Sequence, residues 1–305
     1  MFRVRHLVPT IISLQRLFAQ LGIPSETFSQ FTCILPQSSS CLHPIRTRRH
    51  LYISVLVDRV ANVAWALRSL YSDSDKGHLP LHDKFEMRFL CLHGIGMNAQ
   101  IFRSQMSQIC SALGSDNSFV FLNGSVATKP LPGLEGQYGG PYLRFGPNEG
   151  GDFSAVPDLI EDLLDQAAAE GPFDGIIGFS EGGAVAANMM IMDGQDDPPW
   201  CNFKCGIFFC ALTPVDMTSI AREMRSLSQA QDGILLKVPT AHIWAEGGDQ
   251  YPDMGRELVD LCDGGLREEV IHSLGHEIPG SRSDEFLRDT VRAIERTIER
   301  AKALS

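Results

Sequence analysis

Residues 178–182, Gly-Phe-Ser-Glu-Gly, join an apolar run to a run of small residues. The apolar run, 173–177, predicts a buried strand, and the small residues at 183–188 predict a helix. A sharp turn between such a strand and such a helix strains the central serine and presents its hydroxyl at the edge of a sheet. Glycines two positions before and after the serine keep neighbouring chains from colliding with it. We therefore expect an α/β fold in which Ser180 is a catalytic nucleophile, rather than a simple turn that closes a strand.

A serine nucleophile requires a base and an acid that orients this base. Further strand-like runs follow Ser180, and the last two of them cover residues 239–245 and 268–273. In an α/β-hydrolase the acid follows the first of these two strands and the histidine follows the second. Asp249 and His276 occupy these places. The order Ser180, Asp249, His276 thus predicts a Ser-His-Asp triad on a mostly parallel sheet with helices on both faces.

Other residues compete for two of these roles. Asp216 closes the preceding strand, where some hydrolases place their acid, and Glu246 is nearer to its strand than Asp249 is. His272 precedes His276 by four residues, but it lies inside a strand-like run, where a histidine is more often a packed or surface side chain. The sequence favours Asp249 and His276 and leaves the alternatives open.

A second glycine-containing loop precedes the nucleophile. Residues 88–92 predict a strand, and the loop His-Gly-Ile-Gly-Met-Asn follows it at 93–98. Acyl transfer requires two backbone donors directed at the carbonyl oxygen. We expect the oxyanion hole to consist of the backbone N–H groups of Ile95 and Glu181. His93 is expected to fix this loop through hydrogen bonds rather than to titrate in catalysis.

Two long segments offer candidate walls for a substrate pocket. Residues 129–153 contain aromatic side chains among seven glycines, and loops of this length in a compact domain are usually functional or disordered. We expect a pocket for a large apolar substrate; the alternative is that the aromatic residues anchor a surface loop. Residues 214–237 include a predicted helix at 219–228, which we expect to pack on the sheet rather than to act as a lid. The candidate pocket residues are Tyr138, Tyr142, Phe145 and Trp244.

These motifs resemble those of the fungal serine hydrolases related to the ovarian-tumour-associated serine hydrolases. The resemblance rests on Phe-Leu-Cys-Leu-His-Gly-x-Gly-x-Asn, Gly-Phe-Ser-Glu-Gly-Gly, Pro-Thr-Ala-His-Ile-Trp and Gly-His-x-Ile-Pro, and it extends from Phe85 to the C-terminus. It implies Ser180 as nucleophile, Asp249 as acid and His276 as base, without cofactor or metal. The acid loop, Ala-Glu-Gly-Gly-Asp, is longer than is usual in this family.

The resemblance also implies a substrate class. The family includes esterases and thioesterases that release polyketide chains in fungal secondary metabolism, so the implied substrate is an acyl or polyketide ester or thioester, held in some members on an acyl carrier domain. The alternatives are a general carboxylesterase for small esters and a non-catalytic binding protein with a hydrolase fold. Because a pure binding protein has no need of all three triad residues, the sequence favours an enzyme.

Charge and cysteine content exclude several other classes. Residues 1–86 carry ten Lys/Arg and six Asp/Glu, which leaves 16 Lys/Arg and 31 Asp/Glu, a net charge of −15, in the rest. A domain this acidic is a poor binder of nucleic acid. No run approaches the roughly 18 apolar residues of a membrane span. The eight cysteines form no tidy disulfide or zinc framework, so we expect reduced thiols in an intracellular protein.

Residues 1–84 do not belong to the hydrolase pattern. Residues 1–50 contain six arginines and one acidic residue, a composition typical of a mitochondrial transit peptide, and a spurious extension of the gene model would look the same. Residues 51–70 predict an amphipathic helix, and a polar linker follows. We expect an N-terminal extension at 1–84 and a catalytic domain at 85–305. The expected location is the cytoplasm, or the mitochondrion if the transit peptide is real.

Overall fold

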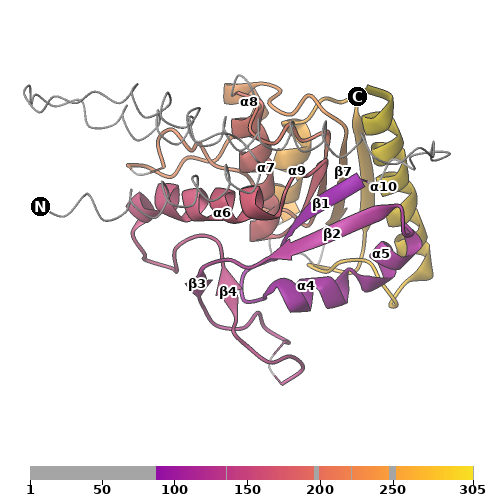
Figure 1. Ribbon diagram of the computed structural model, residues 1–305, viewed down its shortest axis with the longest axis horizontal. Helices are drawn as coiled ribbons and strands as arrows, with labels where there is room; N and C mark the ends of the chain where they lie inside the picture. The colour runs from indigo at the N-terminus through magenta and orange to yellow at the C-terminus, as the bar shows by residue number, and fades with distance from the viewer. Residues whose placement is uncertain (1–86, 135, 196–198, 221, 247–251, 305) are drawn as a thin grey trace, which may run out of the picture. The chain divides into compact units, whose positions relative to one another are not determined.

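A computed structural model describes residues 87–134, 136–195, 199–220, 222–246 and 252–304. The predicted extension and its helix at 51–70 lie outside the described residues. A six-stranded sheet with the order β2-β1-β5-β6-β7-β8 forms the centre of the described part, and all neighbouring strands are parallel (Figure 1). The strands are β1 (Met87–Leu92), β2 (Asn117–Leu122), β5 (Gly175–Phe179), β6 (Cys205–Phe209), β7 (Thr240–Ala245) and β8 (Arg267–His272).

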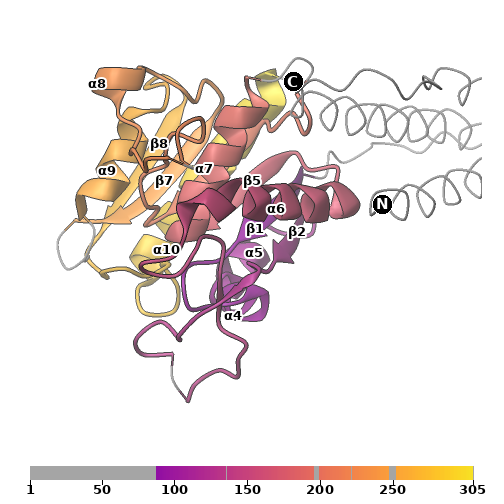
Figure 2. The same cartoon turned by 90° about the vertical axis from the view of Figure 1, so that its left-hand side faces the viewer.

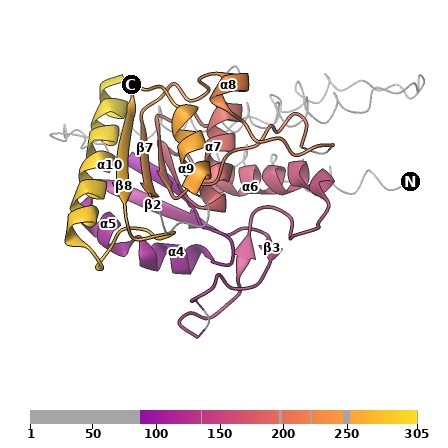
Figure 3. The same ribbon diagram turned by 180° about the vertical axis from the view of Figure 1, so that it is seen from behind.

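Helices cover both faces of this sheet. Neighbouring side chains of β1 show the division: Phe89 packs in one apolar cluster with α4, α5 and α10, whereas Leu90 packs in the other with α6, α7 and α9. The first group is α4 (Ala99–Gln105), α5 (Ser107–Ala112) and α10 (Asp284–Leu304), and the second is α6 (Val156–Glu170), α7 (Glu181–Asp193) and α9 (Pro252–Asp260). Figure 2 shows α6 and α7 in front of the strands, and Figure 3 shows α10 from behind. This arrangement confirms the predicted α/β-hydrolase fold.

Burial explains why the strands were recognisable. Strands β5 and β6 are buried along their whole length, because helices lie on both faces of a parallel sheet and leave no solvent-facing side. Their sequences are correspondingly short apolar runs rather than alternating ones. The carboxyl ends of parallel strands share one edge of the sheet, so the loops that follow β1, β5, β7 and β8 begin at the same edge.

Short elements complete the described part. A two-stranded antiparallel hairpin follows β2 and consists of β3 (Val126–Ala127) and β4 (Leu143–Arg144). The 3-10 helix η1 (Phe153–Ala155) precedes α6, and α8 (Gln229–Asp232) follows the segment after β6. The helix predicted at 219–228 is wrong, because the described residues there form turns and irregular backbone. Polar contacts that involve Asp216 and Arg225 shape this segment instead.

No helix in the described part of the chain combines the length and the apolar character that crossing a membrane requires.

Candidate active site

Ser180 lies at a strained turn between β5 and α7. Its backbone angles, φ 55° and ψ −121°, are sparsely populated for a residue with a side chain and are typical of positions that the surrounding structure enforces. Glycine is required on both sides: a Cβ atom on Gly178 would lie 2.4 Å from the carbonyl oxygen of Gly182, and one on Gly182 would lie 2.3 Å from that of Leu92. The predicted nucleophile turn is therefore present in this structure.

Backbone hydrogen bonds hold this turn in place. The N–H of Ser180 donates to the carbonyl oxygen of Phe209 at 3.0 Å, which joins the turn to the end of β6. The carbonyl oxygen of Ser180 accepts from the N–H groups of Gly183 and Leu212 at 3.0 and 3.1 Å. The partners lie at the end of β6, in the residues that follow it and in α7. All of these bonds are made by the backbone, so the strained conformation does not depend on the serine side chain.

The loop after β1 packs directly on the nucleophile turn. A Cβ atom on Gly94 would lie 3.1 Å from the Cβ atom of Ser180. The loop is fixed from its far side by Leu143, whose carbonyl oxygen accepts from Gly96 at 3.0 Å and whose N–H donates to Met97 at 2.7 Å. Ile95 follows Gly94 in this loop, and Glu181 is the first residue of α7.

His93 anchors the same loop in the way the sequence predicts. Its Nε2 atom lies 3.0 Å from the backbone nitrogen of Gly124, which is a donor, so Nε2 accepts and Nδ1 carries the proton. Nδ1 then donates to the carbonyl oxygen of Gly94 at 2.8 Å. Burial lowers the pKa of His93 to about 4, against a smaller opposite effect of the bond to Gly94. His93 is consequently neutral at pH 7, with both ring nitrogens engaged.

His276 lies in the loop after β8, next to the nucleophile turn. Its ring packs on the ring of Phe179, the residue before Ser180, with 5.1 Å between the centroids. The thiol of Cys210 contacts this loop on both sides of the histidine, at 3.9 Å from the carbonyl oxygen of Gly275 and 3.6 Å from that of Glu277. The ring of His276 therefore lies against the side chain of the residue that precedes Ser180.

The competing histidine, His272, has a different environment. It is the last residue of β8 and is 2 % exposed. His272 is thus a buried strand residue, whereas His276 lies in the loop that follows this strand.

Asp249 belongs to residues 247–251, which lie outside the described residues. The strand that leads to it ends beside the strand that leads to His276: Ala245 is paired with His272, and the N–H of Glu246 donates to the carbonyl oxygen of His272 at 3.1 Å. Glu246 itself is exposed.

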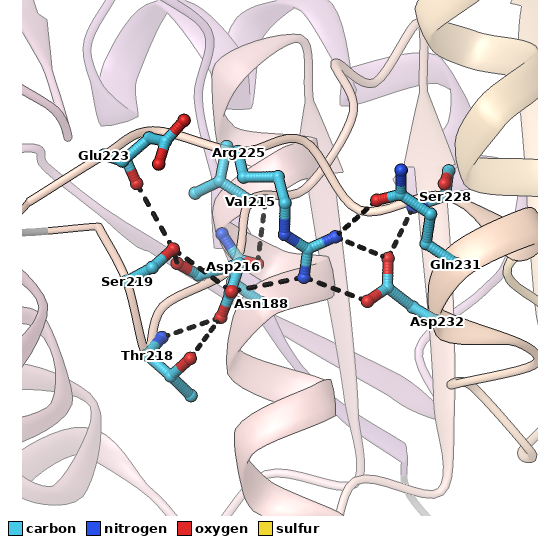
Figure 4. A network of polar contacts seen from close by, with 10 residues as sticks. All are labelled: Asn188, Val215, Asp216, Thr218, Ser219, Glu223, Arg225, Ser228, Gln231 and Asp232. Carbon is cyan, nitrogen blue, oxygen red and sulfur yellow. Dashed lines mark hydrogen bonds and ion pairs between the residues drawn. The ribbon is translucent and has the colours of Figure 1, made fainter.

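Asp216, the other candidate acid, is engaged elsewhere (Figure 4). Its carboxylate accepts from the N–H and the hydroxyl of Thr218 at 2.9 and 2.6 Å and from Arg225 at 3.2 Å. The hydrogen bond from the Thr218 side chain is the largest cause that lowers the pKa of Asp216 to about 2. Arg225 also binds Asp232. Asp216 lines one cavity, of about 500 Å³, and His276 lines another.

The cavity at His276 has a volume of about 480 Å³. Amide and hydroxyl side chains contribute much of its wall, together with the ion pair between Glu277 and Arg282. Its apolar residues come from the segment between β3 and β4, from Phe179 at the end of β5 and from Ile278 in the loop after β8. The lining includes Ser104, Gln105, Gln108, Leu131, Leu134, Gln137, Phe179, His276, Ile278 and Arg282.

The four candidate pocket residues lie elsewhere. Phe145 is 4 % exposed and packs against the ring of His93 with 4.7 Å between the ring centroids. Tyr138 and Tyr142 pack against the apolar cluster that contains Phe89. Trp244 donates from Nε1 to Glu269 at 3.0 Å. None of the four is among the described residues that line the cavity at His276, and their role in binding stays a prediction.

One feature of the site has no signal in the sequence. The carboxylate of Glu181 accepts hydrogen bonds from Arg144, 37 positions earlier in the chain. The sequence predicts a role for the backbone amide of Glu181 and gives no signal for its side chain. Among the described residues, no group of three His, Cys, Asp or Glu side chains is arranged to hold a metal ion.

Comparison with known proteins gives a family. The model of the family described as "Serine hydrolase (FSH1)" matches residues 84–286. The chain is similar to "Esterase FPY3" of Fusarium mangiferae, with 34% identity over 70% of this chain and 98% of the relative. It is also similar to "Hydrolase phiM" of Talaromyces stipitatus, with 32% identity over 63% of this chain and 81% of the relative. Among solved structures, the Bacillus cereus carboxylesterase is 19% identical with a TM-score of 0.42, over 74% of this chain and 98% of that one.

Proposed function

The chain belongs to the serine hydrolase (FSH1) family and is an ester-hydrolysing enzyme, and from this premise we propose that a triad of Ser180, His276 and Asp249 performs the reaction. The observation that carries the proposal is the strained backbone of Ser180 between β5 and α7. The 93–98 loop packs on this turn, and the ring of His276 contacts the ring of Phe179. A serine in this conformation is typical of a nucleophile.

The proposed mechanism is acyl transfer in two steps. His276 removes the proton from Ser180, and the serine oxygen attacks the carbonyl carbon of the substrate. The amides of Ile95 and Glu181 stabilise the negative oxygen of the tetrahedral intermediate. His276 then protonates the leaving group, and a water that His276 deprotonates hydrolyses the acyl-enzyme. Asp249 holds the imidazole in the required tautomer.

Asp249 is the proposed acid because it follows β7, whose end is paired with the end of β8. The carboxylate of Asp216 is occupied by Thr218, Ser219 and Arg225, which supports the choice of Asp249. Glu246 remains the alternative nearest to the strand.

The proposed substrate is an acyl or polyketide thioester or ester. This part rests on the motif resemblance and on relatives named as esterases and hydrolases of fungi. The cavity at His276 offers hydrogen-bonding amides and hydroxyls beside the proposed base, which suits an oxygenated acyl chain. A carrier-bound form of the substrate and a cytoplasmic location belong to the same proposal and rest on the resemblance and the cysteine pattern alone.

Substrate preference tests this proposal. The measurement compares kcat/KM for acyl N-acetylcysteamine thioesters with that for O-esters of the same acyl chains, from two to eight or so carbons. We expect the thioesters and the longer, oxygenated chains to be preferred by about tenfold or more, a difference of about 1.4 kcal/mol in transition-state binding. A preference for acetyl and butyryl O-esters would instead indicate a general carboxylesterase.

A further inference from the structure

The side chain of Glu181 makes an unusually complete set of contacts for a residue next to a nucleophile. Oε1 accepts from Nε and Nη2 of Arg144 at 3.1 and 2.8 Å and from the N–H of Gly146 at 3.3 Å. Oε2 accepts from the N–H of Phe145 at 2.9 Å. The side chains of Arg144 and Glu181 are 15% and 10% exposed. The carboxylate thus binds the segment 144–146 to the first residue of α7.

The same segment holds the other half of the proposed oxyanion hole. Leu143, the neighbour of Arg144, is hydrogen-bonded to Gly96 and Met97 on either side of their peptide bond. The ring of Phe145 packs against the ring of His93 at the start of the 93–98 loop. The carboxylate of Glu181 therefore links α7, which carries one proposed oxyanion donor, to the 143–146 segment. This segment fixes the 93–98 loop, which carries the other proposed donor.

The charge of this carboxylate has a consequence for catalysis. A buried ion without a partner is costly, and a negative charge several ångströms from the amide of Glu181 opposes the negative charge that develops on the substrate oxygen. The guanidinium of Arg144 cancels this charge through two hydrogen bonds to the same oxygen. Two charge-assisted hydrogen bonds from one planar guanidinium also restrict the orientation of both side chains.

We propose that Arg144 and Glu181 form a positioning pair of the oxyanion site: Glu181 anchors the 144–146 segment, and Arg144 neutralises the carboxylate beside the developing oxyanion. This inference rests on the proposed function for its catalytic part. The anchoring part is independent of the reaction.

A double-mutant cycle tests the catalytic part. Arg144→Met leaves an uncompensated carboxylate and should lower kcat by on the order of 10- to 100-fold, the effect of one unit charge a few ångströms away at an effective dielectric constant of about 20. KM should change much less. In a Glu181→Gln background, where no charge requires compensation, Arg144→Met should lower kcat by about threefold or less. Arg144→Lys should retain most of the activity, because it keeps the positive charge.

Two further measurements separate the pair from general stability and from the triad. Lys204→Met is a matched control, since Lys204 and Asp174 form a partly buried pair at 2.7 Å near the opposite end of β5, and it should leave kcat unchanged. Hydrogen exchange at the amides of Phe145 and Gly146 should accelerate at least tenfold in Glu181→Gln, whether or not the protein turns over substrate. Equal losses of kcat from Arg144→Met in both backgrounds, or unchanged exchange, would overturn the proposal. A wild-type protein that hydrolyses no ester would contradict the proposed function and with it the catalytic part, whereas the exchange measurement would still test the anchoring part.

Discussion

At the scale of single residues, the environment assigns different roles to residues of one type. His93 is buried with both ring nitrogens engaged and a pKa of about 4, so it serves as a neutral structural link. His276 lines a cavity beside the nucleophile turn, where a base can reach a substrate. Local sequence already distinguishes the two, because His93 precedes a glycine turn after a strand, whereas His276 lies in a loop that ends in Ile-Pro; the role of His276 as base stays a prediction.

The acid of the proposed triad is open to direct comparison. Asp249→Asn should lower turnover by roughly 10⁴-fold, because an asparagine favours the wrong tautomer of His276. Asp216→Asn is the matched control and should cost little activity, since its carboxylate binds Thr218 and Arg225. Steady-state kinetics of both variants decide the matter. The reverse ranking would move the acid to Asp216, and small losses in both would point to Glu246.

At the scale of elements, the strands were predictable and the connections were not. The runs at 239–245 and 268–273 became β7 and β8 with small shifts of their ends, because a strand that helices cover on both faces needs an apolar run. The helix predicted at 219–228 failed, since its residues are fixed by contacts of Asp216 and Arg225 with residues outside a helical spacing. Such contacts leave no periodic pattern in a sequence.

The candidate site likewise contains one feature that the sequence predicts and one that it does not. Ser180 and its glycines were visible because a nucleophile turn is local, and the structure has the turn where the motif places it. The pair of Arg144 and Glu181 was not visible, because the two residues lie 37 positions apart in the chain and share no motif. The aromatic residues of the long loop suggested a pocket wall by composition alone, and composition does not say which way a side chain points.

At the scale of the whole molecule, the proposed domain boundary has a clear test. The candidate catalytic residues all lie after β1, which begins at Met87, and the family match begins at residue 84. Deletion of residues 1–84 should therefore leave kcat/KM within about twofold of the full-length value, on the basis that no proposed catalytic group is removed.

Melting temperature is the necessary companion measurement for this deletion. If the apolar segment 51–70 covers a face of the enzyme, its removal would expose several side chains at roughly 1.5–3 kcal/mol each and lower the melting temperature without changing the site. Loss of turnover in a truncated protein that melts normally would show that the extension takes part in binding or catalysis.

The central claim is that Ser180 is the nucleophile, and covalent labelling tests it most directly. The measurement is reaction of the wild-type protein and Ser180→Ala with a fluorophosphonate, read by intact mass and by the mass of the peptide that contains residue 180, together with turnover and melting temperature. The wild-type protein should gain one adduct on Ser180. The variant should gain none, lose on the order of 10⁴-fold or more in turnover and melt at nearly the same temperature, because backbone hydrogen bonds hold the turn. Full labelling of the alanine variant would contradict the account.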